Sequence, residues 1–282
     1  MADLAASIRA KLLNVSKIEK VEFQELINRF GAEQFLERLT KSRYAERFIF
    51  KGGSLLAYII ETDRKTRDLD FSIKHVSNDL ADALKLVSEI TQITLEDAII
   101  WSTPTGETLN HPEMEYSGLR IRCDFTLGGA LGQLQMDLAI GDLVTPRKIP
   151  LERIRYKETP LMGPDFEVLA YPPETIFSEK FQTCVSKKGQ NTRMKDYYDL
   201  LKLCGSEVIQ DDLLVTNIRD TFEQRKTDLP TALAFESEDL NRLQSYWSAF
   251  LKKMKIKDAP ENIHDVIEIV NQKLKAINLT TQ

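Results

Sequence analysis

A chain of 282 residues is long enough for one large domain or two closely associated ones, with a substantial core. Its 42% hydrophobic and 29% charged residues are ordinary for a globular protein and exclude a disordered or fibrous chain. The formal net charge is -5, so any contact with nucleic acid must come from a local basic patch and not from the field of the whole molecule.

Cysteine usage and hydropathy indicate where the protein works. Cys123, Cys184 and Cys204 are too few and too far apart for a disulfide framework, so we expect a reducing, cytoplasmic environment. The first ten residues contain no apolar signal segment, and no run of about 18 apolar residues occurs. Neither secretion nor a membrane span is therefore expected.

The first half of the chain is expected to mix helices and strands. Apolar positions at helical spacing in residues 17–46 predict two helices separated near Gly31. A strand over residues 47–51 is expected to run into Gly52, Gly53 and Ser54 and then into an apolar helix, residues 55–60. The polar residues 61–67 predict a loop. The strict alternation of residues 68–73 predicts the next strand.

The rest of the chain passes from strands to helices. After an amphipathic helix over residues 79–93 and a short strand at 98–101, residues 103–116 are expected to form a polar loop. Residues 119–127 and 133–140 predict a hairpin, joined by a connection that contains Gly128, Gly129 and Gly132. One more strand is expected at 166–169. Helices are expected at 174–187, 193–203, 211–225, 237–254 and 261–276.

This order predicts an α+β fold, in which a mixed sheet with helices is followed by a C-terminal helical bundle. The boundary is expected between Leu169 and Pro173. We therefore assign residues 1–170, with a helical N-terminal prefix, to a first domain and residues 171–282 to a helical domain.

Two carboxylates mark the first candidate site. Asp68 and Asp70 stand two apart on the predicted strand, so both point from one face, with about 7 Å between their Cα atoms. Mg²⁺ prefers a few carboxylates and completes its octahedron with water and substrate phosphates. Most Asp-x-Asp pairs are merely solvated, so this pair by itself is weak support for a metal site.

The residues upstream of this pair strengthen the hypothesis. Gly53 and Ser54 follow a strand and open a helix, so their backbone N–H groups and the positive helix end can bind the β and γ phosphates of a nucleotide. Alone, this pattern is more often a turn followed by a helix cap. The spacer of 13 residues between Ser54 and Asp68 makes the combination much rarer.

Two-metal phosphoryl transfer requires a third carboxylate, either to bind the second metal or to deprotonate the attacking hydroxyl. We favour Asp137, because Met136 and Leu138 flank it in an apolar strand where an unpaired ion is costly. Asp124, on the partner strand, is the alternative. Asp142, after Gly141, is expected to be a loop residue.

The order Gly-Ser, spacer, Asp-x-Asp and a later strand aspartate resembles the DNA polymerase β-like nucleotidyltransferase superfamily, with a spacer at the long end of that pattern. A narrower resemblance, to the AbiEii/AbiGii toxin family, covers about residues 45–205. It is carried by four elements in the family's order: Lys-Gly-Gly-Ser (51–54), Asp-Leu-Asp-Phe (68–71), Glu-Lys (179–180) and Lys-Asp-x-x-Asp-Leu (195–200).

The resemblance implies a Mg²⁺-dependent enzyme that uses an NTP, in some members with tRNA as the acceptor, and a role in toxin–antitoxin or abortive-infection systems with a cognate antitoxin. By motif position, Lys180 and Asp196 would complete the active site. Lys180 can neutralise triphosphate charge, and Asp196 and Asp199 share a helix face from which one can orient that lysine. An ion pair that only fixes helix packing is the alternative.

The remaining polar residues give weaker signals. A basic cluster, Lys187, Lys188, Arg193 and Lys195, could follow an RNA backbone together with Lys51, although such runs are more often solvated. Tyr197 and Tyr198 fit either a core or a nucleotide-stacking role. No ligand spacing connects His75, His111 and His264, so neither zinc nor a Ser-His-Asp triad is expected.

The sequence therefore predicts a nucleotidyltransferase with Gly53, Ser54 and Lys180 at the nucleotide, Asp68, Asp70 and Asp137 at the metal, and Asp196 as a further catalytic residue. Two alternatives remain open. The fold could serve as a nucleotide- or partner-binding module without turnover, or the acceptor could be a small molecule or a protein.

Overall fold

The computed structural model describes residues 2–60, 62, 68–74, 79–109, 118–140 and 144–279. The chain divides into two compact units, the first made of Met1–Tyr58 and Thr66–Tyr171, the second of Ile59–Lys65 and Pro172–Gln282. The assignment of residues 1–170 and 171–282 as separate domains stays a prediction.

The first unit begins with two helices, α1 (Ala2–Glu19) and α2 (Phe23–Lys41). The next elements in chain order are β1 (Phe48–Lys51), α3 (Gly52–Ile59), β2 (Asp68–Ile73), α4 (Leu80–Thr91) and β3 (Ile99–Trp101). The remaining strands are β4 (Thr105–Leu109), β5 (Gly118–Leu127), β6 (Ala130–Ile140), β7 (Arg147–Leu151), β8 (Arg155–Tyr156), β9 (Thr159–Pro160) and β10 (Phe166–Ala170).

These strands form an eight-stranded mixed sheet with the order β3-β5-β6-β2-β1-β10-β7, in which β4 also pairs with β5. β2 is parallel to β6 and β1 is parallel to β10, whereas β1 and β2 are antiparallel to each other. β8 and β9 pair separately. The predicted α+β class, a mixed sheet followed by helices, is confirmed.

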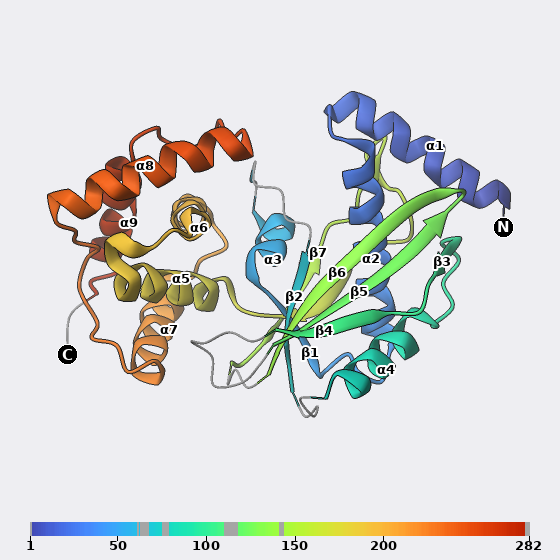
Figure 1. Cartoon of the computed structure of the whole chain (residues 1–282), viewed down its shortest axis with the longest axis horizontal. Helices are drawn as coiled ribbons and strands as arrows, with labels where there is room; N and C mark the ends of the chain where they lie inside the picture. Colours follow the sequence, from blue (N-terminus) through green and yellow to red (C-terminus); the bar gives the residue numbers. More distant parts are fainter. Residues whose placement is uncertain are drawn as a thin grey trace. The chain divides into compact units, whose positions relative to one another are not determined.

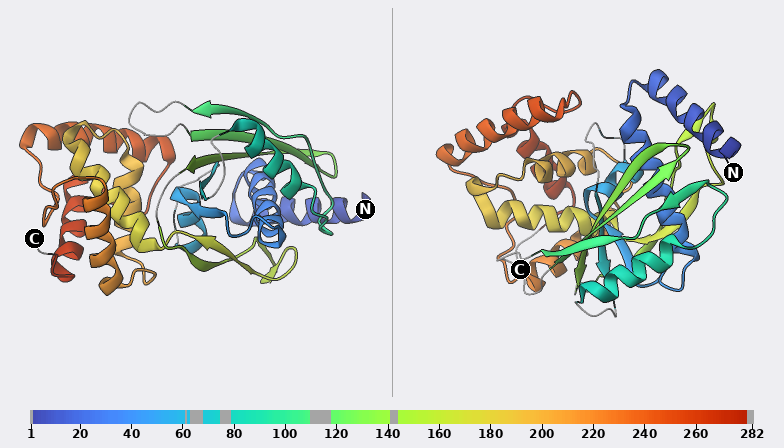
Figure 2. Two further views of the ribbon diagram at one scale, coloured as in Figure 1. Left: turned by 90° about the horizontal axis from the view of Figure 1, so that it is seen from below. Right: turned by 45° about the vertical axis from the view of Figure 1, so that its right-hand side comes forward.

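The helix α2 is the centre of the first unit. It contacts both β6 and β10, and Figure 2 (left) shows strands of the twisted sheet on two sides of it. The sheet face that it covers is aromatic, since Phe35 of α2 lies 6.4 Å from Phe71 of β2, ring centre to ring centre. Residues that alternate with these apolar positions on β2 point to the other face. The polar residues of β2 are therefore displayed on the face opposite α2.

The predicted helix break near Gly31 is wrong, because Gly31 lies inside α2. A Cβ atom on Gly31 would lie 2.2 Å from Cζ of Phe125, and a Cβ atom on Gly132 would lie equally close to the same atom. The ring of Phe125 therefore sits between a glycine of the helix and a glycine of β6. Gly31 serves close packing and not a turn, which a local pattern cannot distinguish.

Gly132 was expected in the hairpin connection and lies instead in β6, opposite Phe125. The connection is the two residues Gly128 and Gly129, both with positive φ, between the paired Leu127 and Ala130. The hairpin itself is confirmed. Two-residue turns of this kind favour glycine because their backbone enters the left-handed region.

Other strands and one helix were missed. β4 occupies part of the predicted loop 103–116, whose residues 110–116 lie outside the described chain, as do residues 61 and 63–67 of the other predicted loop. β7 contains Pro150, which is tolerated because β7 is an edge strand of the sheet. α1 buries Ala5, Ile8, Leu12 and Val15, a helical spacing that was readable in the sequence.

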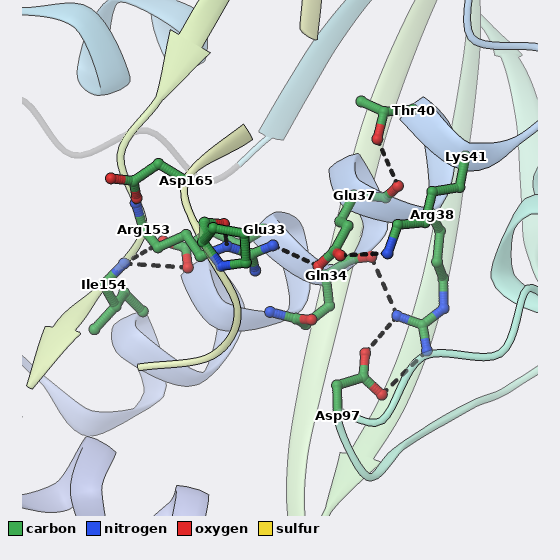
Figure 3. Close-up of polar contacts among 11 residues, drawn as sticks. Glu33, Gln34, Glu37, Arg38, Thr40, Lys41, Asp97, Arg153, Ile154 and Asp165 are labelled. Atoms are coloured by element: carbon green, nitrogen blue, oxygen red, sulfur yellow. Dashed lines mark hydrogen bonds and ion pairs between the residues drawn. The ribbon is translucent and has the colours of Figure 1, made fainter. Parts of the chain in front are cut away.

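A buried polar network fixes α2 to the loops around it (Figure 3). Arg38 donates two hydrogen bonds to Asp97, at 2.5 and 3.1 Å, and both side chains are almost fully buried. Arg153 pairs with Glu37. Glu33 accepts the backbone N–H of Ile154 at 3.0 Å. Hydrogen bonds and ion pairs therefore hold α2 to the segment before β3 and to the segment between β7 and β8.

The second unit is helical: α5 (Pro173–Lys187), the short η1 (Lys188–Gln190), α6 (Met194–Cys204), α7 (Asp211–Gln224), α8 (Ser237–Met254) and α9 (Ile263–Ala276). Each of the five helices agrees with its predicted range to within two residues. α5 packs against α6 and α7, and α9 against α6 and α8 (Figure 1). No helix in the described part of the chain is both long and apolar enough to span a membrane.

We predict that Gly31→Ala destabilises the protein, although alanine is the better helix former. The new methyl group would enter the space of the Phe125 ring, and such overpacking lowers the free energy of unfolding by about 1–3 kcal/mol. Urea unfolding of the single variant and of Gly31→Ala with Phe125→Leu measures this. The double variant is expected to recover part of the loss. A Gly31→Ala protein as stable as wild type would contradict this packing.

Glu33 predicts a pH dependence. Burial raises its pKa from 4.5 to about 7, despite the ion pair with Arg29 and the bond from Ile154. Because the pKa of Glu33 is raised in the folded state, protonated Glu33 stabilises the fold fully below about pH 4.5. This stabilisation is lost as the pH rises through about 7. The loss is about 3 kcal/mol. Relative to wild type, Glu33→Gln should flatten this decline in urea midpoints, whereas exposed Glu96→Gln should not. Parallel wild-type and Glu33→Gln curves would refute the assignment.

Candidate active site

Four charged residues form one row across the sheet. Lys51 of β1 is paired with Asp70 of β2, Asp70 with Asp137 of β6, and Asp137 with Arg120 of β5. Residues paired directly opposite each other project from the same face, and neighbouring strands lie about 5 Å apart. The sheet therefore brings together residues that are up to 86 positions apart in the sequence, from Lys51 to Asp137.

Asp68 lies on the same face as this row. It stands two residues before Asp70 on β2, and its opposite residue on β6 is Gln135. Both aspartates are half-buried, while Leu69 and Phe71 between and beyond them are buried on the other face. The burial of these apolar neighbours fixes the register, because a slip of one residue would bury the carboxylates.

The turn from β1 into α3 presses against Asp70. Gly52 has φ +74°, and a Cβ atom there would lie 2.4 Å from Oδ2 of Asp70. Only glycine fits this position, for its backbone conformation and for its lack of a side chain. Gly52 was not among the predicted site residues. Its signal was present in the sequence as the first member of the Gly-Gly pair.

Gly53 and Ser54 lie in the first turn of α3, where backbone N–H groups have no partner within the helix. Ser54 is only 4% exposed. Its Oγ is buried and has no hydrogen-bond partner among the described residues. A buried polar atom without a partner is unusual and indicates a group that another molecule can satisfy.

Asp137 is bound by Arg120. Nε and Nη2 of Arg120 donate to Oδ1 and Oδ2 of Asp137 at 2.8 and 2.7 Å, a two-point pair. These hydrogen bonds raise the pKa of Arg120 above its ordinary value. Arg120 was not recognised from the sequence, because the spacing of 17 residues becomes a contact only when β5 and β6 pair in this register.

The competing aspartate has a different place. Asp124 is exposed, is paired with Gln133, and accepts a hydrogen bond from its amide at 3.0 Å. Gln133 precedes Gln135 by two residues on β6, and Gln135 lies opposite Asp68, the first residue of β2. Asp124 is thus outside the row that contains Asp70. Asp142 lies outside the described residues.

The carboxylates do not form a closed metal cage. Across the described parts of the chain, no three His, Cys, Asp or Glu side chains form a group that could hold a metal ion. At Asp137 both carboxylate oxygens accept hydrogen bonds from Arg120. The sheet displays three carboxylates on one face, and one of them, that of Asp137, is paired with a guanidinium.

In the second unit, Lys180 of α5 meets two aspartates of α6. Its Nζ lies 3.0 Å from Oδ1 of Asp196 and 2.7 Å from Oδ2 of Asp199, and all three side chains are largely buried. Oδ2 of Asp196 is buried and accepts no hydrogen bond from the described residues, although Nε of Arg193 lies 3.3 Å away. The i,i+3 spacing of the aspartates places both on one helix face, as predicted.

The weaker signals resolve in part. Tyr197 and Tyr198 are fully buried. Tyr197 packs against Phe235, and the hydroxyl of Tyr198 donates to Asp258, so both belong to the core of the helical unit. Within the basic cluster, the exposed members are Lys188, Arg193 and Lys195. His264 is exposed, while His75 and His111 lie outside the described residues.

The fold agrees with comparisons to known proteins. The sequence model of the nucleotidyl transferase AbiEii toxins of type IV toxin–antitoxin systems matches residues 34–271. The chain therefore belongs to the AbiEii nucleotidyl transferase toxin family. The predicted family and enzyme class are confirmed.

Solved structures share the fold at low identity. JHP933 from Helicobacter pylori is 16% identical with a TM-score of 0.53, over 91% of this chain and 94% of that one. A "putative nucleotidyltransferase" from the same organism is 15% identical with a TM-score of 0.52, over 92% of this chain and 97% of that one. At such identities the likeness concerns the fold. No curated protein matches the sequence.

We predict that Lys180→Met strongly destabilises the helical unit. The change would leave the carboxylates of Asp196 and Asp199 buried without the ammonium between them, at a loss of about 3–5 kcal/mol. Urea unfolding followed by circular dichroism measures this. Lys188→Met, at an exposed lysine, is the control and should change the free energy of unfolding by less than about 0.5 kcal/mol. Equal midpoints for both variants would show that the buried ion pairs contribute little.

Proposed function

We propose that this toxin transfers a nucleotidyl group from an NTP to an acceptor hydroxyl, with Asp68, Asp70 and Asp137 as its essential carboxylates. The observation that carries the proposal is the direct pairing of Asp70 with Asp137, with Asp68 two residues along the same face. Three carboxylates on adjacent parallel strands are an oxygen donor set of the kind that Mg²⁺ prefers.

The residues around the carboxylates fit a metal–nucleotide site. Gly52 leaves room beside Oδ2 of Asp70 that any other side chain would fill. Asp68 and Asp70 would hold Mg²⁺, with Asp137 as a further ligand. The chemistry that such an ion supplies is neutralisation of the negative charge on the phosphates and the leaving pyrophosphate.

The start of α3 is suited to bind phosphate. The N–H groups of Gly53 and Ser54, which have no partner within the helix, and the positive end of the helix favour anionic oxygens. The buried hydroxyl of Ser54, which lacks a partner among the described residues, can donate to one of them. These groups would orient the triphosphate and hold its charge away from water.

We assign proton transfer to Asp137. A carboxylate beside the attacking hydroxyl can accept its proton as the new bond to the α-phosphorus forms and pyrophosphate leaves. For Lys180 and Asp196 we propose the roles that the family resemblance implies, charge neutralisation at the triphosphate and orientation of that lysine. Their mutual contact at 3.0 Å supports the second role.

We propose RNA, with tRNA as the first candidate, as the acceptor. The supporting feature is the exposed basic group Lys188, Arg193 and Lys195, whose charges can contact phosphates. An antitoxin is implied by the family. A small-molecule or protein acceptor, and a module that binds a nucleotide without turnover, are the competing outcomes of the experiment below.

We predict that Asp70→Ala stays folded and loses transfer activity roughly 1,000-fold, because the remaining groups cannot hold the metal that neutralises the phosphates. Purified protein is incubated with Mg²⁺, each α-³²P NTP in turn and total cellular RNA, and label is followed in RNA, protein and small-molecule fractions. Asp124→Ala, on the same sheet but outside the row, should match wild type.

The outcomes separate the hypotheses. Label in RNA supports the proposed acceptor, and label in protein or small molecules replaces it. Binding of an NTP by wild type without transfer to any fraction would favour the non-catalytic module. Asp70→Ala protein that transfers label as fast as wild type would contradict the proposed site.

A further inference from the structure

The two arginines of β5 that face the carboxylates have different partners. Arg120 binds both oxygens of Asp137, at 2.8 and 2.7 Å. Arg122, two residues along the same face, donates instead to Gln135 at 3.1 Å and to Glu107 at 2.9 Å. Of these two arginines on the polar face of β5, Arg120 therefore binds the row of carboxylates and Arg122 does not.

Arg120 lies where its charge offsets the repulsion between two neighbouring carboxylates. Asp70 and Asp137 stand directly opposite each other on neighbouring strands, where like charges destabilise a sheet. Lys51 flanks the pair on one side and Arg120 on the other, so the row reads positive, negative, negative, positive. The Arg120 and Asp137 side chains remain 29% and 27% exposed, so a cation from solvent can reach the pair.

We propose that Arg120 is a built-in counter-ion, a positioning residue that holds Asp137 until a divalent cation replaces the guanidinium. The inference rests on the proposed function and adds a way in which the protein regulates metal binding. A two-point pair engages both oxygens of the carboxylate and neutralises its charge, so it competes with metal binding at Asp137. The metal should therefore bind weakly to the empty protein and tightly only when a nucleotide adds its phosphate oxygens as ligands.

The test measures binding of Mn²⁺ alone to the nucleotide-free protein, by the loss of the free-ion signal in electron paramagnetic resonance. Mn²⁺ is chosen because carboxylate and water ligands suit it as they suit Mg²⁺. Arg120→Ala should bind Mn²⁺ about tenfold more tightly than wild type. Arg120→Lys, which keeps the charge but cannot form the two-point pair, should lie between them.

A double-variant comparison assigns the effect to Asp137. The gain in Arg120→Ala should disappear in Arg120→Ala with Asp137→Asn, since the freed carboxylate is then absent. Arg122→Ala, the matched control on the same strand, should bind Mn²⁺ as wild type does. Thermal unfolding of each variant establishes that it is folded, and Arg120→Lys serves if Arg120→Ala is not.

The results separate this inference from the proposed function. If Asp70→Ala binds Mn²⁺ as tightly as wild type does, the metal does not occupy this site and both fail. If binding depends on Asp70 but Arg120→Ala and Arg120→Lys show no gain, the counter-ion role alone is overturned. The same holds if Arg122→Ala gains as much as Arg120→Ala, because the effect would then be one of net charge.

Discussion

The pairing of β2 with β6 is the constraint on which the candidate site depends. The two strands are parallel and in a register that puts Asp70 beside Asp137, and the same register puts Asp68 beside Gln135. A shift of β2 by one residue would turn Asp68 and Asp70 toward α2 and expose Leu69 and Phe71 in their place. The cost of exposing those apolar side chains is what holds the acidic groups in line.

Two acidic residues in direct register repel each other, and positive charge nearby offsets this repulsion. Arg120 and Lys51 provide it from the two flanking strands. The site proposed for a divalent cation and triphosphate thus already contains a protein cation, Arg120. Gly52 leaves the space beside Asp70 open, and the first turn of α3 presents N–H groups that have no partner within the helix.

The opposite face of the sheet shows why this arrangement is rigid. Phe125 is enclosed between Gly31 of α2 and Gly132 of β6, which lets the helix approach the sheet more closely than any larger residue would allow. Arg38, Glu37 and Glu33 then bind the surrounding loops with buried hydrogen bonds and ion pairs. Buried polar bonds of this kind have no good alternative partner, so they fix the helix in one position.

Local periodicity and motif order were enough to predict the fold class, the five C-terminal helices, the β5–β6 hairpin and the candidate residues on β2, α3 and β6. The tertiary fold established that Gly31 and Gly132 serve packing. It also paired Arg120 with Asp137, kept Asp124 out of the row and placed Tyr197 and Tyr198 in the core. These outcomes depend on strand register and on contacts distant in sequence, and one-dimensional patterns do not encode which residues pair across strands.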